Sequence, residues 1–82
     1  MLSPSLKADI VGAILLMLSS GMPVKYVDIK QNVNAQFAAS YPLLVADIQN
    51  YAYNWLYYHS RAGKELNTCI QNNYRYYYID TN

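Results

Sequence analysis

The hydrophobic pattern of this chain changes its period once, near residue 63, and this change limits the folds open to it. Before that point, apolar residues recur at three- and four-residue spacings, which is typical of amphipathic helices. After it, two short runs have the alternating pattern of strands. The sequence therefore predicts a mostly helical fold that ends in a two-stranded β-hairpin.

The first helix is predicted over Leu6–Ser20, with Ser5 as its N-cap and Gly21 just after its end. Its helically spaced apolar residues form one buried stripe: Ile10, Val11, Ile14, Leu15 and Leu18. Leu16 and Met17 extend this apolar surface beyond a single stripe. The surplus predicts a homodimer that covers it.

Two further helices are predicted before the change of period. A short extended piece, Val24-Lys25, leads into a helix over Tyr26–Ala35. The third helix begins at Pro42, a residue favoured in the first helical turn, and continues to about Ala62. Both helices carry an apolar side, so we expect all three to share one core.

The two strand-like runs, Leu66–Gln71 and Tyr74–Ile79, flank Asn72-Asn73. Asparagine tolerates the positive φ that a two-residue hairpin turn requires. In that register the inner face carries Leu66, Ile70, Tyr77 and Ile79, with Arg75 at the tip. The outer face carries Asn67, Gln71, Tyr74, Tyr76 and Tyr78. The alternation agrees on both strands, which favours this register.

The composition indicates one folded domain over residues 1–82. Hydrophobic residues make up 54% of the chain and charged residues 13%, far from a disordered composition. The single cysteine, Cys69, cannot form an internal disulfide, which favours the reducing cytoplasm. The longest apolar run, Ile10–Leu18, is too short to cross a bilayer, so no membrane association is expected.

No residue pattern favours catalysis. His59 and Ser60 are adjacent, so on a helix their side chains point about 100° apart. One histidine and one cysteine are too few for a structural zinc site. The five carboxylates form no evident acid–base pair, and no glycine-rich phosphate loop is present. We expect a binding protein that is not an enzyme and needs no cofactor or metal.

The order of helix, short strand, helix, turn, long helix and hairpin resembles the winged helix-turn-helix superfamily over residues 6–80. The segment Gly21–Ile29 is similar to the junction of its first two helices, and Asn54–Gly63 to the end of a recognition helix entering the wing. The hairpin around Asn72-Asn73 would be the wing. The resemblance implies a transcriptional regulator that binds duplex DNA, and the small size suits one from a phage or plasmid.

The resemblance also implies which residues contact DNA. The third helix of this superfamily enters the major groove, which makes Tyr41, Asp47, Gln49, Asn50 and Tyr53 the groove-facing candidates. Asparagine and glutamine can each form two hydrogen bonds with adenine. Phosphate contacts would come from the basic side chains of Lys25, Lys30, Arg61, Lys64 and Arg75.

A protein-interaction module of the same fold is the alternative. The net charge of +1 is low for a DNA-binding domain, and Asp47 would repel DNA. Tyrosine is enriched at protein interfaces, and the predicted register places Tyr74, Tyr76 and Tyr78 together on the outer face. Such a module would inhibit or adapt a protein partner through this tyrosine-rich face.

Overall fold

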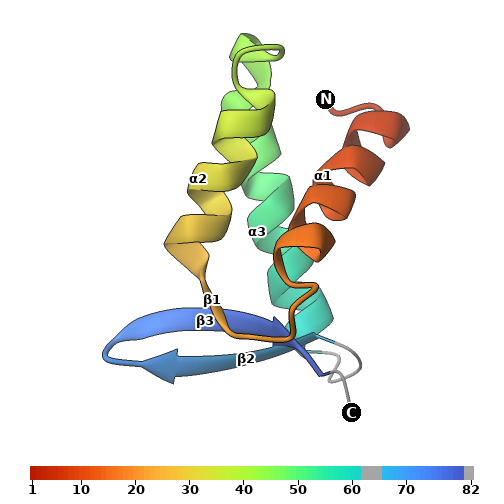
Figure 1. Cartoon of the computed structure of the whole chain (residues 1–82). Coiled ribbons are helices and arrows are strands. Elements are labelled where there is room, and N and C mark those ends of the chain that lie inside the picture. The colour runs from red at the N-terminus through yellow and green to blue at the C-terminus, as the bar shows by residue number, and fades with distance from the viewer. Residues whose placement is uncertain (62–65, 81–82) are drawn as a thin grey trace.

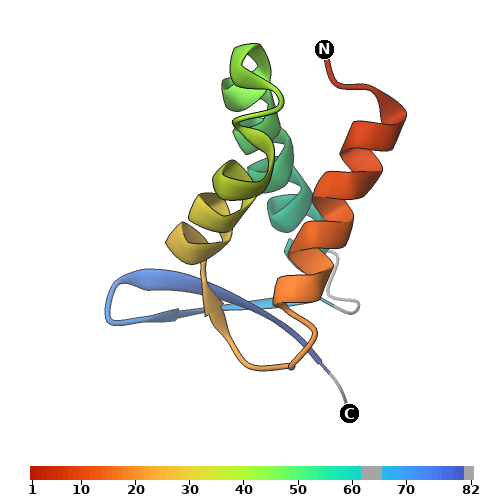
Figure 2. The same ribbon diagram turned by 45° about the horizontal axis from the view of Figure 1, so that its top comes forward.

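Three helices lie on one side of a small antiparallel sheet in the computed structural model, which describes residues 1–61 and 66–80 (Figures 1 and 2). The prediction of a mostly helical chain with a C-terminal β-hairpin is confirmed. The elements follow in the order α1 (Pro4–Met17), β1 (Val24–Lys25), α2 (Tyr26–Phe37), the 3-10 turn η1 (Pro42–Leu44), α3 (Val45–Arg61), β2 (Leu66–Gln71) and β3 (Tyr74–Ile79).

Helix α1 begins earlier than predicted because its N-cap is Ser3, and the assignment of Ser5 was wrong. The Leu6 backbone N–H donates to Ser3 Oγ over 3.2 Å. Pro4 then occupies the first turn, where its missing N–H costs nothing. The helix ends at Met17, ahead of the predicted end at Ser20. The chain turns afterwards through Gly21, whose φ of 79° suits glycine.

The other two helices also differ from prediction at their ends. Helix α2 continues past Ala35 to Phe37, which packs against the core. The third helix starts at Pro42 as predicted, but its first turn is 3-10 and the α-helix proper begins at Val45. Its predicted end at Ala62 lies outside the described residues.

The hairpin has the predicted turn and register. Asn72 and Asn73 have φ values of 51° and 67°, and both values are positive as a type I′ turn requires. Thr68 lies opposite Tyr77, and Ile70 lies opposite Arg75. The inner face is buried only near the helices. Ile70 lies on this face as predicted, but near the tip it is 62% exposed.

A third strand anchors this hairpin, and the sequence pattern did not predict its pairing. Strand β1 pairs antiparallel with β3, which gives the sheet order β1-β3-β2. Val24 lies opposite the buried Tyr77, so β1 ties the hairpin to the start of α2.

The core lies between the helices and the inner face of the sheet. Burying each large apolar side chain there contributes about 1.5–3 kcal/mol to stability. Every helix and the hairpin supply members of this fully buried set: Ile10, Ile14, Leu18, Ile29, Val33, Ile48, Leu56 and Tyr77. No helix within the described residues is long and apolar enough to span a membrane.

Candidate nucleic-acid interface

A cavity of about 240 Å³ lies between the C-terminal half of α3 and the inner face of the hairpin. Two arginines border it, Arg61 from α3 and Arg75 from β3. Among the residues that the structure describes, no carboxylate lines it, and the other lining residues are aromatic or hydroxyl-bearing: Tyr53, Tyr57, Ser60, Thr68 and Tyr77. The arrangement therefore suits an anion.

On the α3 side, the lining residues follow from the helical repeat. Residues four apart share a helix face, so Tyr53, Tyr57 and Arg61 form one stripe. The rings of Tyr53 and Tyr57 stack with centroids 6.3 Å apart. Arg61 donates from Nη1 to Tyr57 Oη over 2.6 Å, and its Cζ lies 5.3 Å from the ring centroid. These contacts hold the guanidinium at the cavity.

On the hairpin side, one hydroxyl orients the second arginine. Arg75 donates from Nη1 to Thr68 Oγ1 over 3.0 Å. Thr68 Oγ1 in turn donates to the Tyr76 carbonyl oxygen over 2.9 Å. The hydroxyl has one proton and two lone pairs, so both bonds can form at once. Arg75 is thus fixed by the strand opposite.

Two tyrosine hydroxyls beside the cavity favour their neutral form. Burial raises the pKa of Tyr77, and the nearby Arg75 charge offsets only part of that rise. Burial also raises the pKa of Tyr26, with a smaller contribution from Tyr53. Tyr26 makes edge contacts with the Tyr53 and Tyr77 rings. Tyr26 and Tyr77 therefore hold their protons and add no negative charge at neutral pH.

Three of the predicted DNA-contacting residues meet at this cavity, namely Tyr53, Arg61 and Arg75. Asn50 is exposed on α3, one turn before Tyr53, so it extends the same stripe. Gln49 instead donates from Nε2 to Asn34 Oδ1 over 2.8 Å and is half-buried against α2.

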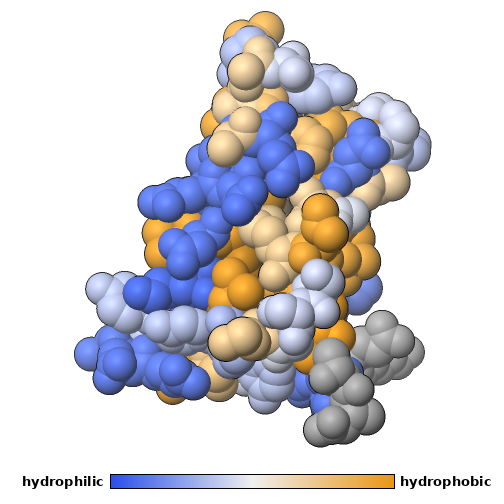
Figure 3. All heavy atoms as spheres, in the orientation of Figure 1, coloured by the Kyte–Doolittle hydropathy of each residue, from blue (hydrophilic) through white to orange (hydrophobic). Residues whose placement is uncertain are grey.

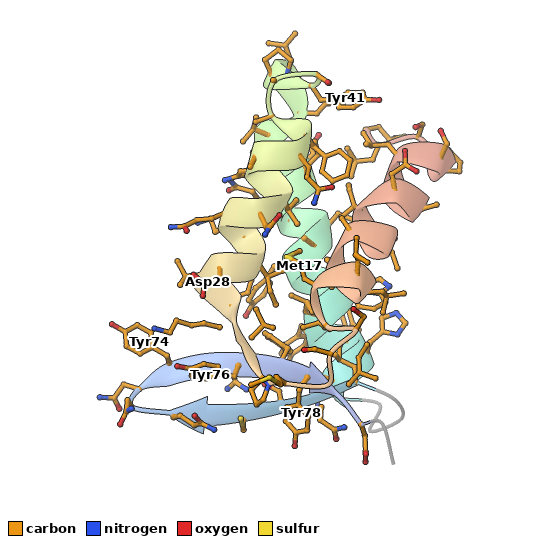
Figure 4. All side chains as sticks on the ribbon, in the orientation of Figure 1. Met17, Asp28, Tyr41, Tyr74, Tyr76 and Tyr78 are labelled. Carbon is orange, nitrogen blue, oxygen red and sulfur yellow. The ribbon has the colours of Figure 1, made fainter. Side chains whose placement is uncertain are left out.

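The other predicted contacts lie apart from the cavity. Lys25 is on the outer face of the sheet, with its Nζ 4.3 Å from the Tyr74 ring centroid. Tyr41 lies at the end of the molecule opposite the hairpin (Figure 4). Lys30 is exposed on α2. Asp47 lies 3.6 Å from the N-terminal amine. Lys64 lies outside the described residues.

The tyrosines proposed for a protein partner share the outer face, as predicted. Tyr74 is 54% exposed, whereas Tyr76 and Tyr78 are half-buried. Cys69 is half-buried on the same face, opposite Tyr76. Lys25 covers part of this surface, since its Nζ is also 6.0 Å from the Tyr76 centroid.

Four lining residues were not among the sequence candidates: Tyr57, Ser60, Thr68 and Tyr77. The four-residue spacing from Tyr53 through Tyr57 to Arg61 was the signal for the first of these. The hairpin register predicts Thr68 opposite Tyr77. The sequence did not indicate that the hairpin packs against α3, and only the tertiary structure shows it.

Histidine and acidic side chains make no recognisable catalytic group in the described part of the chain. His59 stacks on Trp55, with ring centroids 4.3 Å apart. No cluster of three or more metal-ligating side chains occurs within residues 1–61 and 66–80. No family model, curated protein or solved structure matches this chain.

Proposed function

We propose that this protein is a small winged-helix regulator of transcription that binds duplex DNA and acts in the cytoplasm without catalysing a reaction. The observation that carries the proposal is the cavity between α3 and the hairpin. The two elements expected to contact DNA border this cavity together, and each supplies an arginine. Phosphate is the anion that DNA presents along its whole length.

The exposed stripe of α3 provides the surface for reading bases. Asn50 is exposed, and its amide can donate and accept at one adenine edge. Tyr53 and Tyr57 continue the stripe toward Arg61. Gln49 is a weaker reader, because it already bonds Asn34 within the fold. The proposed base contact therefore rests on Asn50, and the arginines position the duplex through its backbone.

A homodimer is part of this proposal. Leu16 is 74% exposed on α1, and Leu15, wrongly predicted to be part of the buried stripe, is 42% exposed. Figure 3 shows hydrophobic atoms near the C-terminal end of α1. Met17, also assigned to this surface from the sequence, is half-buried and packs against the core. The dimer surface would therefore centre on Leu15 and Leu16. A symmetric dimer would address two half-sites on the duplex.

A protein-interaction module is the second candidate, and the exposed hairpin tip favours it. Ile70 and Tyr74 are 62% and 54% exposed there, on opposite faces of the hairpin. Exposed aromatic and aliphatic side chains anchor many protein interfaces. In this case Tyr74, Tyr76 and Tyr78 would contact the partner.

One titration separates the two candidates. A fluorescent duplex of mixed sequence is titrated with the protein at several salt concentrations, and molar mass is measured in parallel. Binding through phosphates must weaken steeply as salt rises. Absence of duplex binding even at low salt would contradict the DNA proposal and favour the protein-interaction module.

A further inference from the structure

We propose that the cavity between α3 and the hairpin is a two-arginine clamp for a single phosphate group. The inference rests on the proposed function, because it assumes that the bound phosphate belongs to the DNA backbone. The new element is that Arg61 and Arg75 bind the same phosphodiester. Two independent surface contacts would bind different phosphodiesters.

The first support is that two arginines line one cavity from separate elements. Arg61 comes from the last turn of α3, and Arg75 from the tip end of β3. Arg61 donates a 2.6 Å hydrogen bond to the Tyr57 hydroxyl on the same helix. Arg75 donates a 3.0 Å hydrogen bond to the Thr68 hydroxyl on the neighbouring strand of the hairpin. Both bonds are exposed to solvent, and each favours a side-chain position beside the cavity.

The second support is the balance of donors and charges. A guanidinium has five N–H donors, and the bonds to Tyr57 and Thr68 each occupy one Nη1 atom. The remaining donors match the paired oxygen atoms of a phosphate. Because no carboxylate lines the cavity within residues 1–61 and 66–80, no lining residue in that part of the chain neutralises the two arginine charges. An entering phosphate supplies the missing negative charge.

The third support is the character of the remaining walls. Tyr53 and Tyr57 offer ring surface, whereas the hydroxyl groups of Ser60 and Thr68 already donate to the Tyr57 and Tyr76 carbonyl oxygens. Ring surface can pack against the sugar that flanks a backbone phosphate, which free phosphate lacks. This difference allows the two sources of phosphate to be distinguished by experiment.

The clamp is tested first with inorganic phosphate on the full-length protein. The side-chain N–H resonances of both arginines are followed by NMR during the titration. We expect Arg61 and Arg75 to shift together with one dissociation constant, and Lys7→Ala, which removes a charge on α1, to leave that constant unchanged. Shifts with different constants, or none at all at high phosphate, would overturn the clamp.

The second arm uses duplex DNA and a double-mutant cycle. Arg61→Ala and Arg75→Ala should each weaken binding roughly tenfold. If they share one phosphate, the double variant loses much less than the product of the single losses. If the affinity loss of the double variant instead equals the product of the two single losses, the clamp is overturned, while the proposal that the protein binds DNA still stands. Paired arginine shifts with phosphate in a protein that binds no duplex would instead uphold the anion site and contradict the proposed function.

Loss of folding is controlled by circular dichroism and by conservative variants. Arg61→Lys and Arg75→Lys keep the charge but remove the planar fork of donors. In the clamp, the lysine variants recover only part of the affinity lost in the alanine variants. Full recovery by lysine at both positions would show that charge alone suffices, which contradicts the paired geometry.

Discussion

Arg75 donates a 3.0 Å hydrogen bond to Thr68, which lies on the partner strand of the hairpin. The bond holds the guanidinium beside Thr68, and both residues line the cavity that α3 also borders. Because Thr68 occupies the inner face opposite Tyr77, the register of the hairpin decides where this charge points. A shift of register by one residue would turn Arg75 to the outer face.

Thr68→Val should weaken duplex binding without unfolding the hairpin. Valine keeps the β-branched shape and strand preference but cannot accept from Arg75. Valine also cannot donate to the Tyr76 carbonyl oxygen, so we expect a stability loss of about 0.5–1.5 kcal/mol for each of the two bonds, with the exposed bond to Arg75 contributing less. Urea unfolding and DNA titration measure the two effects. Thr68→Ser, which retains the hydroxyl, should bind as wild type, and equal losses in both variants would contradict the role of the hydroxyl.

Arg75→Ala should leave the fold intact and weaken binding to all duplex sequences by a similar factor. The side chain is exposed at the hairpin tip, so its removal uncovers little core. One lost phosphate contact should reduce the slope of log affinity against log salt by about one unit. The slope is obtained from titrations at four or more salt concentrations. An unfolded variant would show that Arg75 has a structural role.

Two neighbouring amides on α3 should behave differently. Gln49→Ala removes the 2.8 Å bond to Asn34 and should cost about 0.5–1.5 kcal/mol of stability. Asn50→Ala should change stability little and reduce discrimination between duplexes, since a good base contact contributes about 1–3 kcal/mol. Competition titrations with several sequences measure discrimination. The reverse pattern would place the reading surface on the other side of α3.

Leu16→Glu should convert the proposed dimer into a monomer. Leu16 is 74% exposed, so the charge is tolerated in the monomer but would be buried in a dimer formed through α1. Light scattering over a tenfold dilution measures the change in mass. Leu43→Glu serves as the matched control, because Leu43 is 95% exposed in η1 at the other end of the molecule. A monomeric wild type at high micromolar concentration would rule out the dimer.

The elements of this fold could be predicted from the sequence, whereas the cavity could not. Periodicity located the three helices, and Asn72-Asn73 set the hairpin register, because both signals are local in the chain. The helix ends could not be predicted as closely. Ser3 and Ser5 are both good N-cap residues, and only the structure shows that Ser3 caps α1.

Contacts between distant segments needed the structure itself. The pairing of β1 with β3 and the approach of the hairpin to α3 depend on packing that no local pattern encodes. Gln49 and Asn50 are adjacent in sequence and of similar chemistry, yet one faces α2 and the other is exposed. Their difference follows from the direction in which α2 packs, and sequence spacing alone does not supply it.

Alkaline pH should destabilise the protein through Tyr77. Burial raises the pKa of its hydroxyl in the folded state above the unfolded value, so the native state holds the proton more tightly. The stability from this group is fully present below about pH 10 and is lost as pH rises through the raised pKa. Thermal melts from pH 8 to 11 should show the decline, with tyrosinate absorbance rising as the protein unfolds. Tyr77→Phe removes this titration and should flatten the decline, leaving the contribution of Tyr26, whose pKa is also raised by burial. An identical decline in wild type and Tyr77→Phe would show that other groups govern alkaline unfolding.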